Sequence, residues 1–274
     1  MNLDAAAPAP AAGQDFDVDC VLTYQVQGTT DFLFQIHAFN GRDQTVLSES
    51  LTVTPPVPLH VYSDPTQLQR CTRLQVASGP FELHYQARVR RSVEAEDPNA
   101  AEVPIWQVPD EVLSNLMPTR YCESDLLSHA AQKQFGGHPP GHARVTAICD
   151  WIHTHIDYQV GTSTATTTAC DVFTQRAGVC RDFAHLGVTF CRALNIPARL
   201  VVGYSNFSTP PPDFHAVFEA WLGGRWVLFD ATRMAPLNGL VRIASGRDAK
   251  DVPFAMIYGP ATMTSMNPTA TPVG

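Results

Sequence analysis

The chain has 274 residues, of which 45% are apolar and 16% are charged. This length predicts one large domain or two of ordinary size, and the apolar fraction excludes a wholly disordered protein. The formal net charge of -8 argues against a nucleic-acid partner bound mainly through its phosphates. No apolar run approaches the ~18 residues that a membrane helix needs, so no membrane partner is expected either.

Seven cysteines are spread widely through the sequence, at positions 20, 71, 122, 149, 170, 180 and 191. Their odd number, wide spacing and lack of a CxxC pair argue against a disulfide framework and against a structural zinc site. The first 14 residues are rich in alanine and proline and lack the basic start and apolar core of a secretory signal. We therefore expect residues 1–14 to be a disordered tail and the protein to be cytoplasmic, with reduced thiols.

Residues 15–97 show the alternation of apolar and polar side chains that is typical of β-strands. In the first run Val18, Cys20 and Leu22 alternate with other residues at period two, and later runs are separated by turn sequences such as Asn-Gly and Ser-Gly-Pro. Short alternating segments punctuated by turns predict an antiparallel β-sandwich or barrel, of which we take the sandwich.

From residue 110 the spacing of apolar residues changes to a helical period. Helices are expected over residues 124–135 and 143–155, and a third opens at a capping box formed by Thr168 and Asp171. We expect a disordered tail over residues 1–14, a β-sandwich domain over 15–97 and a proline-bearing linker over 98–109. A catalytic domain should follow over residues 110–262, and a flexible C-terminal tail over 263–274.

A further helix is expected over residues 180–194, directly after a glycine-containing break. Its apolar face contains small residues at Ala184 and Gly187, which predicts close packing against a sheet. Cys180 falls in its first turn, where free N–H groups and the helix dipole favour a thiolate and can stabilise an oxyanion. The alternative is that Cys180 is a small buried apolar residue, as we expect for Cys191 on the same face.

Two β runs meet at Gly223-Gly224, which is a strong signal for a two-residue hairpin loop. In that register Trp221 faces Trp226, and His215 is the diagonal neighbour of Asp230 on the same face of the sheet. Diagonal neighbours lie roughly 7–8 Å apart at the backbone, so an imidazole and a carboxylate in these positions can meet. The hairpin register therefore predicts a pair between His215 and Asp230.

Cys180, His215 and Asp230 together follow the logic of a cysteine nucleophile. His215 would accept the thiol proton and later protonate the leaving amine, while Asp230 would hold the ring tautomer and stabilise the imidazolium. The alternative is a structural strand histidine bonded to Asp230 with no nucleophile nearby. We favour catalysis because three suitable residues arise on elements that would pack together.

Residues 142–259 resemble the transglutaminase-like superfamily, in particular its bacterial branch of transglutaminase-like enzymes and candidate cysteine proteases. The motifs that carry this resemblance lie at residues 176–186, 196–204, 215–221, 226–232 and 246–252. Residues 16–91 resemble the β-sandwich domain that commonly precedes this core in bacteria. The resemblance implies a papain-like α+β core, with the cysteine helix packed on an antiparallel sheet. It also implies that Cys180 is the nucleophile, His215 the base and Asp230 the orienting acid.

The sequence departs from the family pattern in one turn, where Ala231-Thr232 stands in place of the common Pro-Thr. Eukaryotic members use a tryptophan upstream of the cysteine as a second oxyanion donor, and here Tyr158 and Trp151 are the candidates for that position. Asp182 and His185 also belong to the cysteine motif. They lie off the cysteine's face of the helix, so we expect structural roles for both.

The expected reaction is attack by a Cys180 thiolate on an amide carbonyl, release of the amine and formation of a thioester. With water as acceptor the protein is a peptidase or amidase acting on a peptide or isopeptide bond, which we favour. With an amine as acceptor it is a transglutaminase, and a non-catalytic binding module that retains the fold is a further alternative. No cofactor and no metal are expected, since no P-loop, dinucleotide fingerprint or metal-ligand cluster occurs. The expected partner is a peptide or protein substrate, and no oligomeric state is predicted.

Overall fold

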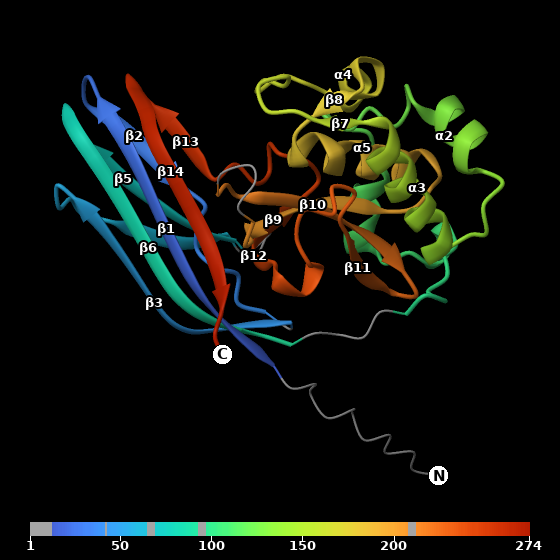
Figure 1. Ribbon diagram of the computed structural model, residues 1–274, viewed down its shortest axis with the longest axis horizontal. Coiled ribbons are helices and arrows are strands. Elements are labelled where there is room, and N and C mark those ends of the chain that lie inside the picture. The colour runs from blue at the N-terminus through green and yellow to red at the C-terminus, as the bar shows by residue number, and fades with distance from the viewer. Residues whose placement is uncertain (1–12, 42, 65–68, 93–96, 208–211) are drawn as a thin grey trace, which may run out of the picture.

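The computed structural model describes residues 13–41, 43–64, 69–92, 97–207 and 212–274. Figure 1 shows a β-sandwich beside a unit of helices packed on a smaller sheet. The strands of the sandwich are β1 (Gln14–Val26), β2 (Thr30–Phe34), β3 (Gln44–Thr54), β4 (His60–Asp64), β5 (Gln69–Val76), β6 (Gly79–Arg91), β13 (Ala255–Tyr258) and β14 (Ala261–Pro272). They form two antiparallel sheets in the orders β14-β1-β6-β3 and β13-β2-β5-β4.

Alternating side chains from the two sheets fill the interior of the sandwich. Every second residue of β1 is buried along most of the strand. Phe32 and Phe34 of β2 and Phe81 of β6 surround Tyr24, with ring centroids 5.2, 6.0 and 6.1 Å from that of the tyrosine. This packing of two inner faces confirms the antiparallel β-sandwich that the period-two alternation predicted.

The last two strands of the chain return to the sandwich. β14 pairs with β1 from Phe16↔Pro272 to Val26↔Ala261, and β13 pairs with β2. Figure 1 shows the red β14 alongside the blue β1. The expectation of a flexible tail over residues 263–274 is therefore wrong, and the second unit ends before β13 rather than at residue 262.

The position of β14 at the edge of its sheet explains why its sequence does not read as a core strand. Most of its residues are polar or exposed, and it contains Pro268 and Pro272. An edge strand has one side without a partner, so it tolerates proline, and threonine favours the extended backbone. The polar composition that predicted a flexible tail is thus compatible with an edge strand.

The second unit has a four-stranded sheet in the order β11-β10-β9-β12, with helices packed against it. Its strands are β7 (Asp157–Tyr158), β8 (Ala177–Gly178), β9 (Ala198–Tyr204), β10 (His215–Leu222), β11 (Arg225–Phe229) and β12 (Val241–Gly246). Its helices are η1 (Ile105–Gln107), α1 (Asp110–Leu113), η2 (Ser114–Leu116), α2 (Ser128–Phe135), α3 (His142–His155), α4 (Ala169–Gln175), α5 (Cys180–Ala193) and η3 (Leu237–Gly239). In the part of the chain that the structure describes, no helix is long and apolar enough to cross a membrane.

Helix α5 lies against this sheet, as its small residues predicted. A Cβ atom added to Gly187 would lie 2.5 Å from the ring of Phe218 in β10, so a side chain at this position would push the helix away. The capping box at the start of α4 is also present. Asp171 Oδ2 accepts the Thr168 N–H at 2.9 Å, and Thr168 Oγ1 accepts the Asp171 N–H at 3.4 Å.

Hydrogen bonds and ion pairs fasten the two units and the segment between them. The side chain of Gln44 in β3 donates to the carbonyl of Arg242 at 2.9 Å and accepts the N–H of the same residue at 2.8 Å. In the connecting segment Glu102 forms a 2.9 Å ion pair with Arg144 of α3. The expected linker is therefore packed on the second unit where the structure describes it.

Candidate active site

Cys180 is the first residue of α5 and follows β8 directly. The start of the helix is held by Asp182, whose Oδ2 accepts the N–H of Val179 at 2.9 Å. A Cβ atom on Gly178 would lie 2.8 Å from the Cβ of Asp182, so this approach requires a glycine. Cys180 is buried, with 9% of its surface exposed. Its sulfur lies at the end of the helix that carries free N–H groups and the positive end of the dipole.

His215 begins β10, and Asp230 follows β11 across the hairpin turn. Trp221 pairs with Trp226, as the two-residue loop predicted. At the other end of the hairpin, Nε2 of His215 lies 2.9 Å from Oδ2 of Asp230, and both side chains are buried. The structure therefore contains the His–Asp contact that the hairpin register predicted.

His215 and Asp230 each stabilise the charged form of the other. Burial alone would lower the pKa of His215, but the hydrogen bond with Asp230 and the nearby thiol of Cys180 raise it to about 9. Burial likewise opposes ionisation of Asp230, yet its hydrogen bonds with His215 and Thr232 lower the pKa of this carboxyl below its usual value. Thr232 donates its N–H and its hydroxyl to Oδ1, at 2.8 and 2.7 Å. At neutral pH the ring is thus protonated and the carboxylate ionised.

The imidazole of His215 lies between Cys180 and Asp230. Since Nε2 is bound to the carboxylate, Nδ1 is the nitrogen left for the thiol, and it has no hydrogen-bond partner among the described residues. The sulfur of Cys180 lies 3.8 Å from the carbonyl oxygen of Phe214. Phe207 meets the imidazole edge-on, with ring centroids 5.6 Å apart. The structure therefore brings the three predicted site residues together in one cluster.

Tyr158, in β7, also lies against Cys180. It pairs with Gly178, two residues before Cys180, and its ring lies 5.8 Å from that of Phe183, measured between centroids. Burial and the charge of the neighbouring thiol raise the pKa of the Tyr158 hydroxyl, so it stays protonated and can donate a hydrogen bond. Trp151, the other candidate, stacks instead on His155 and Phe173, with ring centroids 4.6 and 5.8 Å away. Sequence spacing could not separate the two, because the approach of β7 to α5 is a long-range contact.

The other polar residues of the cysteine motif take structural positions, as expected. Asp182 binds the backbone at the start of α5. His185 is buried, accepts the N–H of Ala249 at 3.1 Å and stacks on Tyr121 at 5.1 Å. Burial, helped by nearby arginines, lowers the pKa of His185 to about 3, so it is a neutral side chain. Within the described ranges, no group of three or more His, Cys, Asp or Glu side chains is placed to hold a metal ion.

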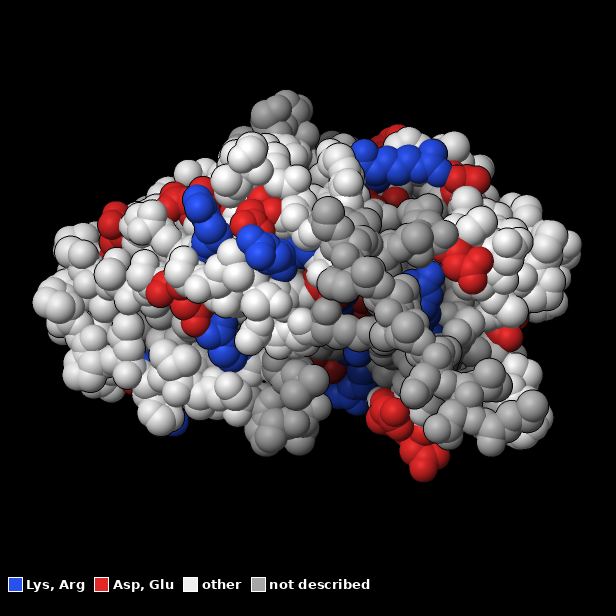
Figure 2. Space-filling view, turned by 90° about the horizontal axis from the view of Figure 1, so that it is seen from below, with Lys and Arg blue, Asp and Glu red and all other residues white. Residues whose placement is uncertain are grey.

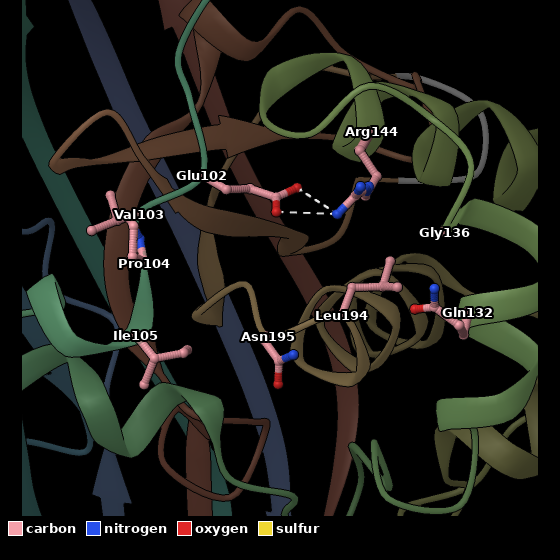
Figure 3. Close-up of a pocket in the computed structure, with 9 residues that line it drawn as sticks. All are labelled: Glu102, Val103, Pro104, Ile105, Gln132, Gly136, Arg144, Leu194 and Asn195. Atoms are coloured by element: carbon pink, nitrogen blue, oxygen red, sulfur yellow. Dashed lines mark hydrogen bonds and ion pairs between the residues drawn. The ribbon is translucent and has the colours of Figure 1, made fainter.

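Two cavities lie away from this cluster. One, of about 400 Å³, is formed by the connecting segment and helices α2, α3 and α5, and the Glu102–Arg144 ion pair lies across it (Figure 3). The other, of about 1180 Å³, lies between the two units and is lined by paired charges such as Arg199 and Glu219. Figure 2 shows acidic and basic side chains interspersed on the face seen from below. None of the three site residues lines either cavity.

Comparisons with known proteins agree with this fold. The family model of the transglutaminase-like superfamily matches residues 128–231, and that of the bacterial transglutaminase N-terminal domain matches residues 14–111. The crystal structure of a candidate cysteine protease from Cytophaga hutchinsonii is similar over 96% of this chain and 91% of that chain, with 42% identity and a TM-score of 0.90.

Mycobacterial relatives match over shorter regions. An uncharacterized protein of Mycobacterium leprae is 30% identical over 166 residues, which is 58% of each chain. An uncharacterized protein of Mycobacterium tuberculosis is 30% identical over 116 residues, which is 37% of each chain. The matched region thus spans less than two thirds of either relative. With the Cytophaga structure matched over nearly its full length and both family models placed in the expected order, the chain belongs to the transglutaminase-like superfamily.

Proposed function

We propose that the protein is a cysteine hydrolase that cleaves peptide or isopeptide bonds through a thioester on Cys180. The observation that carries this proposal is the 2.9 Å bond between His215 and Asp230, with the sulfur of Cys180 3.8 Å from the carbonyl oxygen of the preceding residue, Phe214. An imidazolium beside a thiol at a helix start favours the thiolate, which is the reactive form. The 42% identity to a candidate cysteine protease supports the same chemistry.

In the first half-reaction the Cys180 thiolate attacks the amide carbonyl carbon, forming the C–S bond and moving the carbonyl π electrons onto oxygen. As the C–N bond breaks, His215 gives its Nδ1 proton to the leaving nitrogen, so an amine departs and a thioester remains. In the second, neutral His215 takes a proton from the water that attacks the thioester, and the thiolate leaves. Asp230 holds the ring and stabilises its charged form throughout.

The carbonyl oxygen becomes negatively charged in both tetrahedral intermediates. We propose that the backbone N–H of Cys180 and the hydroxyl of Tyr158 both donate to this oxyanion, because the pairing of β7 with β8 brings Tyr158 beside the start of α5. Tyr158→Phe removes one donor while keeping the ring, so kcat should fall about 100-fold with little change in KM. Steady-state kinetics on a cleaved peptide measure this. An unchanged kcat, or a loss confined to KM, would assign Tyr158 to packing or substrate binding instead.

Hydrolysis and amine transfer share the thioester and differ only in the acceptor. We favour water because it is the default acceptor at a thioester unless the site excludes it. The test incubates the protein with glutamine peptides and a fluorescent primary amine, and follows both amine incorporation and release of the free acid. Release of acid without incorporation supports hydrolysis, whereas incorporation as the main product makes the protein a transglutaminase. Neither product, with Cys180 unreactive, leaves the alternative of a binding module.

We also propose that the protein acts in a reducing, cytoplasmic setting. The mechanism needs Cys180 as a free thiol, and the other six cysteines are likewise free in the structure. Five of the six are buried, which leaves them poorly accessible to oxidants and to each other.

A further inference from the structure

The sheet that contains β13 has an open edge on the β13 side. The strand order is β13-β2-β5-β4, so β13 pairs with β2 alone among the strands that the structure describes. Natural proteins usually protect such an edge with proline or charged residues, because it can pair with another chain. β14 carries two prolines, whereas β13 consists of Ala255, Met256, Ile257 and Tyr258 and carries neither proline nor charge.

The register of β13 shows which of its main-chain groups face outward. The N–H of Gln35 donates to the carbonyl of Phe254 at 2.9 Å, just before the strand begins. Hydrogen-bonded pairs alternate along an antiparallel ladder, so the next ones fall on Met256 and Tyr258. The N–H and C=O groups of Ala255 and Ile257 therefore point toward the open edge.

This edge begins beside the candidate active site. Phe254, immediately before β13, stacks on Phe214 with ring centroids 4.9 Å apart. The carbonyl oxygen of Phe214 lies 3.8 Å from the sulfur of Cys180, and His215 is the next residue. Figure 1 shows β13 on the side of the sandwich that faces the helical unit. The open edge thus leads from the sandwich to the thiol.

The side chains along the edge suit an extended peptide. Ile257 is 38% exposed and Tyr258 is 62% exposed, so both present apolar surface to solvent. The hydroxyl of Tyr258 lies 3.7 Å from the sulfur of Met256. Four residues of strand span about 13 Å, enough to pair with four residues of a partner. Main-chain pairing of this kind gives affinity that depends little on sequence, while exposed side chains add preference.

We propose that β13 binds the substrate: an extended segment of the peptide or protein substrate pairs with Ala255 and Ile257 along the open edge and so carries its amide bond to Cys180. This inference rests on the proposed function, since it assumes that Cys180 is the nucleophile. In this arrangement the β-sandwich binds part of the substrate. Extended chains should therefore be better substrates than short or compact ones.

The test uses two variants at one position. Ile257→Pro removes the outward N–H, whereas the ladder bonds to β2 fall on the neighbouring residues and remain. Ile257→Ala removes the side chain and keeps the N–H, so it is the matched control. The probes are iodoacetamide and a library of randomised octapeptides capped with an iodoacetyl group. Both alkylate a thiolate with loss of iodide, and the second-order rate at Cys180 is measured by mass spectrometry.

In the wild type the capped octapeptides should label Cys180 at least about tenfold faster than iodoacetamide, the gain expected from two or three main-chain hydrogen bonds. Ile257→Pro loses one of these bonds and directs its ring toward the partner strand, so it should reduce the advantage to about threefold or less. Ile257→Ala should keep most of it. The iodoacetamide rate should be the same in all three proteins, which also shows that the site is folded. No octapeptide advantage in the wild type, or an equal one in Ile257→Pro, overturns the inference. A Cys180 that iodoacetamide does not label overturns the proposed function instead.

Discussion

Replacing Cys180 with alanine is expected to lower the rate of amide hydrolysis by about 10⁶-fold, the loss typical of removing the nucleophile from a catalytic triad. Without the sulfur no thioester can form, and only binding and polarisation of the carbonyl by the oxyanion donors remain. The measurement is the initial rate at which new amino termini appear in a peptide mixture, compared at equal concentrations of wild type and variant. Unchanged thermal unfolding of the variant shows that the loss is chemical.

Cys191→Ala is the matched control for this experiment. Cys191 lies on the same helix, is fully buried, and its burial raises the pKa of its thiol, so it has no route to reactivity. This variant should keep the wild-type rate and lose only the stability that a small cavity costs, about 1 kcal/mol. Substantial hydrolysis by Cys180→Ala, or equal losses in the two variants, would contradict a nucleophilic role for Cys180.

The contact between His215 and Asp230 could be predicted because it depends on local structure. Gly223 and Gly224 adopt φ values of 59° and 77°, the left-handed conformations that a tight hairpin turn requires. Such a turn determines the register of its two strands, and the register determines which side chains meet. Cys180 was found by a similarly local signal, the glycine break before an amphipathic helix. The helix alone left Cys180 open between a nucleophile and a buried apolar residue, and the choice also rested on the expected packing of its helix against the hairpin.

The surroundings of the site could not be predicted in this way. β14 joins a strand from the other end of the chain, and its polar sequence has no apolar period that would indicate a partner. Tyr158 approaches Cys180 because β7 pairs in parallel with β8, through Tyr158↔Gly178. Parallel strands have no connecting turn to set their register. The chemistry therefore follows from local patterns, whereas the groups that would meet a substrate follow from packing between distant segments.

Asp230→Ala is expected to lower kcat by up to about 10⁴-fold and to move the alkaline limb of the pH–rate profile downward. The reaction needs protonated His215 to donate to the leaving nitrogen, and the pKa of about 9 places the loss of that proton near pH 9. The Asp230 carboxylate is one of the groups that raise the pKa of His215 in opposition to burial. Its removal should therefore move the alkaline limb to lower pH. Asp230→Asn keeps the size of the side chain and removes its charge. Because Thr232 donates to Oδ1, the amide NH2 group would face Nε2 and could not accept the ring proton, so kcat should fall about as far as in Asp230→Ala and the limb should shift in both variants.

The raised pKa of His215 also predicts how the free energy of unfolding depends on pH. His215 binds its proton more tightly in the folded chain than at its ordinary pKa of 6.5, so the stabilisation is complete below pH 6.5 and lost as the pH rises through about 9. In Asp230→Ala the free energy of unfolding should decrease less between pH 6 and 9.5 than it does in the wild type. Urea denaturation over this pH range measures the difference. Asp150→Asn is the control, since Asp150 is an exposed carboxylate paired with Arg233; it should leave the kinetic limb and the stability slope unchanged. An alkaline limb that stays near pH 9 in both Asp230 variants would mean that Cys180 alone holds the imidazolium, and Asp230 would then serve only to orient the ring.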